Sequence, residues 1–243
     1  MKKSPDQPIF LRDAEIFRDL TEAEVDALGE KMPMKDYAAK TVFYTPQDKT
    51  EIVFMIKRGR VQLYRLSASG DIFMTAILEA GTFFGEMALL GQKLYGNFAE
   101  AATDCTICLI SRADARKYLI GDERIAYCII ETLGKRLLEL EQRLADSALK
   151  RVPARVASLL LQFANKQIEH QNKSKTNSAN EIEIFCTHEE LAQLLGIHRE
   201  TMTRTLREFS RLNFIRLGRG RILLLDMDGL LDLSAVRGKS FIM

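Results

Sequence analysis

The sequence predicts an α+β fold in which a domain of short strands is followed by a long helix and then by a helix-turn-helix with a β-hairpin. Three observations predict it: short β-rich runs between residues 41 and 111, a helical apolar seam between 122 and 149, and two helical patterns that meet near Gly196. A chain of 243 residues is long enough for two ordinary domains. We expect these domains at 1–121 and 150–243, joined by the helix at 122–149.

The composition is that of a globular protein, with 47% hydrophobic and 28% charged residues. No apolar run reaches the roughly 20 residues that a membrane span needs, and the first residues do not resemble a signal peptide. Four scattered cysteines form no disulfide framework, which is consistent with a reducing compartment. We therefore expect a cytoplasmic protein with no membrane partner.

Six short runs predict the strands of the first domain. They lie at 41–44, 52–56, 60–66, 72–78, 98–103 and 105–111, and glycines at intervals of 11, 11 and 10 residues punctuate them. Such spacing is typical of an all-β sandwich or barrel. Ahead of the strands, residues 14–32 have helical spacing, and Thr21 and Glu24 form the pattern of a capping box.

The strongest periodic signal in the chain lies in the helix expected at 122–149. Its apolar residues, which alternate in spacing between four and three, are Ala126, Ile130, Leu133, Leu137, Leu140 and Leu144. A helix of this length usually extends beyond a small β domain, so we expect the seam to pair with its copy in a parallel homodimer. The alternative is that it packs only on its own β domain. The flanking charged residues, Arg136 and Arg143 among them, are expected to face solvent.

A second helix is expected at 152–168, with Pro153 in its first turn. The polar stretch at 170–180 predicts a mobile loop, and the alternation at 181–186 predicts a strand.

Residues 187–211 predict a helix-turn-helix. Thr187 and Glu190 form a capping box at the start of the first helix, and Gly196 permits a tight turn at its end. At 100° per residue, the second helix directs one set of side chains to the core: Met202, Thr205, Leu206 and Phe209. The opposite side carries Glu200, Thr203, Arg204, Arg207 and Arg211, with Arg199 on its shoulder.

Charge and a predicted β-hairpin indicate that this segment binds double-stranded DNA. Residues 1–149 have a net charge of −3 and residues 150–243 a net charge of +5, and seven arginines but no lysine lie between 199 and 221. Arginine binds phosphates and guanine edges through two parallel hydrogen bonds, and glutamate accepts from cytosine. Strands at 214–217 and 221–225 would form a wing that brings Arg219 and Arg221 to the phosphate backbone. The alternatives are an ordinary solvated surface and a winged helix without DNA.

These features, in this order, resemble the CRP/FNR superfamily of bacterial transcription regulators, over residues 16 to 233. The motifs that carry the resemblance are THEELAQLLG at 187–196 and RETMTR at 199–204. Likeness to the cyclic-AMP receptor protein implies that Arg199, Glu200 and Arg204 read bases in palindromic TGTGA-like half-sites, and that Thr187 and His188 contact phosphates. We assign backbone contacts also to Thr201, Thr203, Arg207, Arg219 and Arg221. The resemblance implies RNA polymerase as a further partner. Relatives in this family often have a Ser or Thr as the cap of the second helix, and this chain has His198 there.

GTFFGEMALL at 81–90 resembles the family's phosphate-binding cassette, which implies a cyclic-nucleotide-binding-like β-roll that serves as a sensor or effector domain. In the family an arginine eleven residues after the cassette glycine pairs the cyclic phosphate, and here that count from Gly85 gives Gly96. Leu140 and Glu141 stand where cyclic-AMP-binding relatives place a Thr-Ser pair. We therefore predict a vestigial effector pocket at Gly85, Glu86, Gly96 and Asn97, with no cyclic AMP and no cofactor. The alternative is a regulator that binds a cyclic nucleotide or another small effector.

The sequence carries no zinc-ligand spacing, nucleophile elbow or phosphate loop, so we expect neither an enzyme nor a metal site. Cys105 and Cys108 lie in one predicted strand, where their sulfur atoms would point to opposite faces. We expect both to fill the core, and Cys128 to pack beside the seam, with a thiol switch at Cys128 as the alternative.

Overall fold

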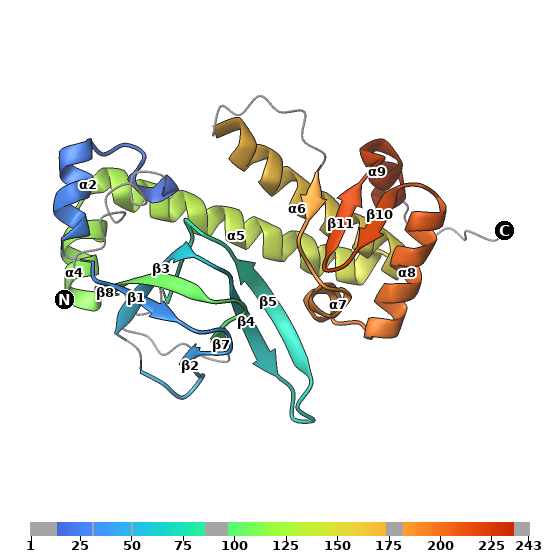
Figure 1. Ribbon diagram of the computed structural model, residues 1–243, viewed down its shortest axis with the longest axis horizontal. Coiled ribbons are helices and arrows are strands. Elements are labelled where there is room, and N and C mark those ends of the chain that lie inside the picture. The colour runs from blue at the N-terminus through green and yellow to red at the C-terminus, as the bar shows by residue number, and fades with distance from the viewer. Residues whose placement is uncertain (1–13, 31, 50, 86–96, 174–181, 236–243) are drawn as a thin grey trace. The chain divides into compact units, whose positions relative to one another are not determined.

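The computed structural model describes residues 14–30, 32–49, 51–85, 97–173 and 182–235 (Figure 1). The chain divides into two compact units, Met1–Leu137 and Leu138–Met243. This division falls within the long helix, and the domain limits that we expect at 121 and 149 stay a prediction.

Two antiparallel four-stranded sheets form most of the first unit (Figure 1) and confirm the β domain. One has the order β1-β8-β3-β6 and the other the order β2-β7-β4-β5. The six expected strands are all present, with ends that differ by at most two residues: β2 (Val42–Tyr44), β3 (Ile52–Arg58), β4 (Val61–Leu66), β5 (Ile72–Leu78), β7 (Phe98–Ala101) and β8 (Cys105–Ser111).

Two strands were not expected from the sequence. β1 (Met34–Tyr37) has a polar and largely exposed sequence, and it pairs with β8. β6 contains only Phe83–Phe84 and pairs with β3. Both owe their extended conformation to the partner strand, because neither has an alternating pattern of its own.

Aromatic side chains fill the interior of the β domain. Phe54 and Phe84 stack with ring centroids 4.8 Å apart, and Phe43 and Tyr44 contact them at angles. Cys105 belongs to this cluster, whereas Cys108 belongs to the second core cluster, beneath the N-terminal segment and the long helix. The two cysteines therefore lie on opposite faces of β8, as predicted. Both are buried, and burial raises the pKa of Cys108 to about 12.

The helical spacing at 14–32 corresponds to two separate helical segments. The structure has a short 3₁₀-helix η1 (Glu15–Phe17) and a separate helix α2 (Glu22–Gly29). The capping box is correct and explains the break: Thr21 has an extended backbone (φ −72°, ψ 160°), which an N-cap requires and a continuous helix forbids.

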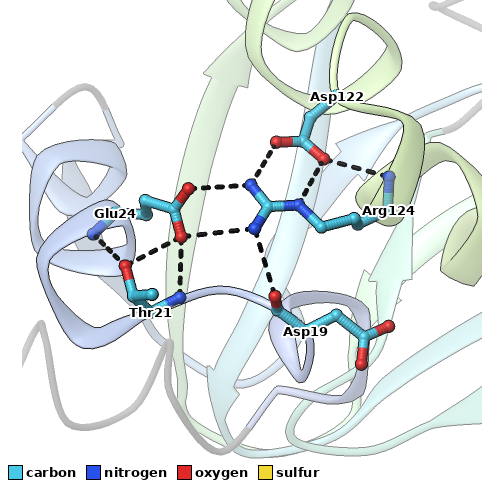
Figure 2. Close-up of polar contacts among 5 residues, drawn as sticks. All are labelled: Asp19, Thr21, Glu24, Asp122 and Arg124. Atoms are coloured by element: carbon cyan, nitrogen blue, oxygen red, sulfur yellow. Dashed lines mark hydrogen bonds and ion pairs between the residues drawn. The ribbon is translucent and has the colours of Figure 1, made fainter.

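One arginine joins α2 to the start of the long helix α5 (Glu123–Leu149), as Figure 2 shows. The guanidinium of Arg124 makes five hydrogen bonds, one for each of its N–H groups, to the carbonyl of Asp19 and the carboxylates of Glu24 and Asp122. Glu24 also accepts from the backbone and hydroxyl of Thr21. Arg124 and these Thr21 donors lower the pKa of Glu24 to about 2. A second link, Arg18 to Glu131 at 2.9 Å, lies further along α5.

The long helix α5 confirms the helix expected at 122–149, after a short α4 (Arg112–Asp114) and a π-helical turn η2 (Ala115–Ile120). One side, with Ile125, Cys128 and Ile129, is buried against the N-terminal segment. Burial raises the pKa of Cys128, which opposes the reactivity that a thiol switch needs.

Most of the seam on α5 is exposed. Ile130 is 68% exposed and Leu144 73% exposed, and Leu137 and Leu140 are also in solvent. Leu133 differs from the expectation, because it is partly buried and packs against the core cluster of its own chain. Arg136 was also expected to face solvent, but it donates to the Phe83 carbonyl at 2.5 Å and lies over the Phe83 ring.

The second unit contains the three-stranded sheet β10-β11-β9 and four further helices among the residues described (Figure 1). Helix α6 packs against α8 and α9. The elements are α6 (Val152–Lys173), β9 (Glu183–Ile184), α7 (His188–Leu195), α8 (Arg199–Arg211), β10 (Ile215–Gly218), β11 (Arg221–Leu224) and α9 (Met227–Ala235).

The predicted start of the loop, at residue 170, is too early, because α6 continues to Lys173. Polar residues such as glutamine, glutamate and lysine support a helix, and no glycine or proline interrupts the chain before Ser174. Residues 174–181 lie outside the described part of the chain. The expected strand at 181–186 is shortened to β9, and α9 was not predicted.

The end of α5 is fixed to α6 by buried polar contacts. Asp146 is 6% exposed and accepts from Gln142 at 2.7 Å and from Lys150 at 3.0 Å, while Lys150 also donates to Ser158. Arg143 is largely buried rather than solvated as expected, and burial lowers its pKa. Among the described residues, no helix is long and apolar enough to cross a membrane.

Candidate nucleic-acid interface

The first helix of the helix-turn-helix starts at the predicted capping box. The hydroxyl of Thr187 accepts from the backbone amide of Glu190 at 3.1 Å, and the carboxylate of Glu190 accepts from the backbone amide of Thr187 at 2.7 Å. Leu191, Ala192 and the pair Leu194–Leu195 are buried. The N-terminus of α7 is therefore held by its own side chains, with His188 as its first helical residue.

The turn between the helices depends on Gly196. This residue is left-handed (φ 60°, ψ 43°), a conformation that glycine adopts without steric cost. The next amide, of Ile197, donates to the carbonyl of Ala192 at 3.0 Å. Arg155 of α6 donates to the carbonyl of Leu195, so α6 also holds this corner. The turn therefore fixes the direction in which α8 leaves.

Helix α8 separates its side chains into the two predicted faces. Met202, Thr205, Leu206 and Phe209 are buried, whereas Arg199, Glu200, Arg204, Arg207 and Arg211 are exposed. His198 is the N-cap, and its side chain makes no capping hydrogen bond, as expected from the missing Ser or Thr. The arrangement confirms an exposed, arginine-rich face on a helix anchored by its other side.

Thr187, Thr201 and Thr203 lie around this face in different degrees of exposure. Thr187 is exposed, and Thr201 and Thr203 are half-buried. Thr203 lies 3.1 Å from Nδ1 of His188, a contact between α7 and α8 that the sequence did not predict. The buried hydroxyl of Thr205 donates to the Thr201 carbonyl.

The exposed face has few internal partners among the described residues. Arg199 forms one long ion pair, with Nε 3.8 Å from Oε2 of Glu189, and both side chains are more than half exposed. Glu189 also accepts from Gln193 at 3.1 Å. Such exposed pairs contribute little to stability, so Arg199 can exchange this partner for another acceptor.

The wing is present as β10 and β11, which pair in register from Ile215–Leu224 to Gly218–Arg221. Arg219 is exposed in the turn. Arg221 forms an ion pair with Glu183 of β9 at 3.0 Å, so it is less free to contact phosphate than the sequence indicates. Arg216 is exposed on β10, a position that alternation along the strand could have identified.

The structure describes two of the four residues of the expected effector pocket, Gly85 and Asn97. Gly85 is buried and left-handed (φ 79°), and a Cβ there would lie 2.8 Å from the Ile52 carbonyl, so backbone packing alone requires glycine. Asn97 accepts from Arg65 at 3.1 Å. Glu86 and Gly96 lie outside the described residues.

Metal ligation has no support in the described residues, where no group of three or more His, Cys, Asp or Glu side chains could hold an ion.

Comparison with known proteins matches both halves of the chain to family models. A cyclic nucleotide-binding domain model matches residues 34–122, and a Crp-like helix-turn-helix model matches residues 154–233. The chain is 31% identical to the transcriptional regulator SdrP of Thermus thermophilus over 195 residues, which cover 80% of this chain and 88% of that protein. It is 25% identical to a CRP-like cAMP-activated global transcriptional regulator of Mycobacterium tuberculosis, over 91% of this chain and 96% of that protein.

Solved structures agree in fold. A CRP/FNR-family transcriptional regulator from Thermus thermophilus superposes with a TM-score of 0.62 at 29% identity, covering 85% of this chain and all of that one. A CooA mutant from Carboxydothermus hydrogenoformans reaches 0.70 at 23% identity, over 91% and 94% of the two chains, a likeness of fold alone. SdrP, the Mycobacterium tuberculosis protein and the CRP/FNR-family protein are transcriptional regulators, which are not enzymes. From the two matched domains and the relative at 31% identity, the chain belongs to the CRP/FNR family of transcriptional regulators.

Proposed function

We propose that the protein is a homodimer that binds palindromic TGTGA-like DNA without cyclic AMP. The observation that carries this proposal is α8, whose exposed side presents Arg199, Glu200 and Arg204 while its other side is anchored in the core. A helix held in this way can enter the major groove without losing its packing.

Base reading is assigned to Arg199, Glu200 and Arg204. An arginine can donate two hydrogen bonds to O6 and N7 of guanine, and a glutamate can accept from N4 of cytosine. All three side chains are exposed and lie in the first two turns of α8, the part of a recognition helix that reaches base edges.

Phosphate contacts are assigned to residues that surround this face and to the wing. The hydroxyl and cationic groups are those of Thr187, His188, Thr201, Thr203, Arg207, Arg219 and Arg221. Such contacts set position and affinity and carry no sequence information by themselves. Arg221 would have to release or share its ion pair with Glu183.

Dimerisation is supported by the exposed apolar side of α5. Besides the seam residues Ile130, Leu137, Leu140 and Leu144, the exposed residues include Tyr127, Leu138 and Leu149. Ala126 is half-buried at the start of the seam. Large apolar side chains exposed to water along one helix are unfavourable, and pairing with a second copy would bury them. A symmetric dimer would place two α8 helices in successive major grooves, about 34 Å apart.

The proposal that the protein does not use cyclic AMP is supported by the residues at the expected nucleotide contacts. Gly96 stands in place of an arginine, and Leu140 and Glu141 stand in place of a Thr-Ser pair. The match of residues 34–122 to a cyclic nucleotide-binding domain favours the alternative, a regulator that binds a nucleotide or another small effector. Calorimetry with cyclic AMP separates them, because micromolar binding that tightens operator affinity supports the alternative. RNA polymerase is the further partner that we propose.

The proposal is tested by fluorescence anisotropy with a TGTGA-type palindrome and a scrambled duplex of equal length, at one moderate salt concentration, together with light scattering on the free protein. We expect a dimer that prefers the palindrome by at least about 1000-fold in affinity. A monomer, or equal affinity for both duplexes, contradicts the proposal.

A further inference from the structure

The contact between His188 and Thr203 connects the two helices of the helix-turn-helix at the edge of the exposed face. His188 is the first residue of α7, and its Nδ1 lies 3.1 Å from the hydroxyl oxygen of Thr203 on α8. Both side chains are half-buried. Because Nδ1 is engaged with Thr203, Nε2 is the ring nitrogen that remains for another partner.

The surroundings of His188 oppose a charge on its ring. Burial, followed by the nearby guanidinium groups of Arg199 and Arg207 on α8, lowers the pKa of His188. Two acidic groups of α7 lie nearby. Glu189 is 3.8 Å from Arg199, and Glu190 is held in the capping box by Thr187. With both present, the pKa of His188 is still lowered. In the free protein these surroundings therefore favour the neutral form of the imidazole.

A DNA backbone would oppose the effect of these cations on His188. Its phosphates would pair with Arg207, which removes the repulsion that this cation exerts on the imidazole, and would attract a positive charge on the ring. We propose that His188 takes up a proton when α8 binds DNA, so that the His188–Thr203 pair contacts a backbone phosphate through a charged imidazole and a hydroxyl group. This inference rests on the proposed DNA-binding function and adds a proton linkage to it.

The sign of the linkage follows from the two states. If the pKa of His188 is higher in the complex than in the free protein, the extra affinity is fully present below the free-state pKa and is lost as the pH rises through the pKa of the complex. Each unit of difference contributes up to about tenfold in affinity for each protomer. The effect acts through a phosphate, so it applies to the palindrome and to a scrambled duplex alike.

The test compares DNA affinity at pH 6 and pH 8, at constant ionic strength, for the wild-type protein and two variants. His188→Asn keeps a hydrogen-bonding group near the position of Nδ1 but cannot titrate. His198→Asn is the matched control, because it removes the other histidine of this region, an exposed one. We expect affinity to rise about fivefold or more at pH 6 for wild type and His198→Asn, and by less than about twofold for His188→Asn.

A second measurement does not depend on the variants. The chain has three histidines, so their ring ¹³Cε1–H resonances can be followed by pH titration in the free protein and on DNA. A His188 resonance that titrates at higher pH on DNA supports the inference. An unchanged His188 titration, or equal pH dependence in wild type and His188→Asn, overturns it and leaves the DNA-binding proposal intact. No binding to either duplex at both pH values overturns the two together.

Discussion

Arg124 in the first unit and the exposed arginines of α8 in the second unit have opposite surroundings. In the first unit, Arg124 makes five hydrogen bonds to its own chain. In the second unit, Arg204 and Arg207 are exposed on α8, and Arg199 has only a long exposed ion pair among the described contacts that involve it. A saturated guanidinium stabilises the fold, whereas an exposed one keeps its donors for a base edge or a phosphate. The number of arginines in a segment therefore does not assign their role, and their surroundings do.

The largest expected effect comes from Arg204→Ala, which removes a donor from the exposed set. We expect the affinity for a TGTGA-type palindrome to fall by about 1–3 kcal/mol for each half-site. The free energy of unfolding should change by less than about 0.5 kcal/mol, because the side chain is exposed. Anisotropy and urea denaturation measure the two quantities.

Arg219→Ala is the control for Arg204, because both arginines are exposed and only their assigned partners differ. It should weaken binding to the palindrome and to scrambled DNA alike, and lower the slope of log affinity against log salt by about one for each phosphate that the arginine no longer neutralises. If both variants lose the same affinity on both duplexes, the division into base-reading and phosphate-binding residues is wrong.

The opposite outcome is expected for Arg124, whose loss should lower the thermal midpoint and leave DNA affinity unchanged. Arg124→Lys should rescue little, because an ammonium group has three donors and cannot replace the five hydrogen bonds of the guanidinium. Thermal denaturation of Arg124→Lys and Arg124→Ala provides the check. Full stability in the lysine variant would show that charge alone holds this junction.

Acid should weaken the same junction in a defined range. The pKa of Glu24 is lowered from 4.5 to about 2, so its contribution to stability is present above pH 4.5 and is lost as the pH falls from 4.5 through about 2. Because the group is exposed, the effect is screened by solvent and salt. Urea midpoints at pH 6, 4 and 3 should converge between wild type and Arg124→Ala, and a constant difference would contradict this account.

The smallest effect is expected from His198→Asn. The side chain of His198 caps no backbone amide of α8, and asparagine is among the best N-cap residues. We expect the free energy of unfolding to rise by about 1 kcal/mol in urea denaturation, with DNA specificity unchanged. A decrease would show that the imidazole has a structural contact that asparagine cannot replace.

Features set by neighbouring residues could be predicted from the sequence. The capping boxes at Thr21 and Thr187, the turn at Gly196 and the two faces of α8 depend on residues within a few positions of one another. The exposed position of Arg199, Glu200 and Arg204 followed from helical periodicity alone. Their assigned contacts with DNA depend on the family resemblance and stay a prediction.

Features set by distant residues could not be predicted. The strand β1 depends on β8, the junction at Arg124 depends on residues about 100 positions away, and Leu133 is partly buried by the N-terminal segment. The contact between His188 and Thr203, 15 residues apart, requires the crossing of α7 and α8. Sequence periodicity contains no information on which distant segment covers a given side chain.

The separation of faces on α8 also affects how such a regulator can acquire new target genes. The residues that hold the helix in place, Met202, Leu206 and Phe209, are distinct from the exposed residues at 199, 200 and 204. If the exposed residues read bases as we propose, substitutions among them would redirect the protein to other promoters one base pair at a time, with little cost to folding. Operator sequences and these exposed residues could therefore change together during evolution while the buried residues of α8 stay the same.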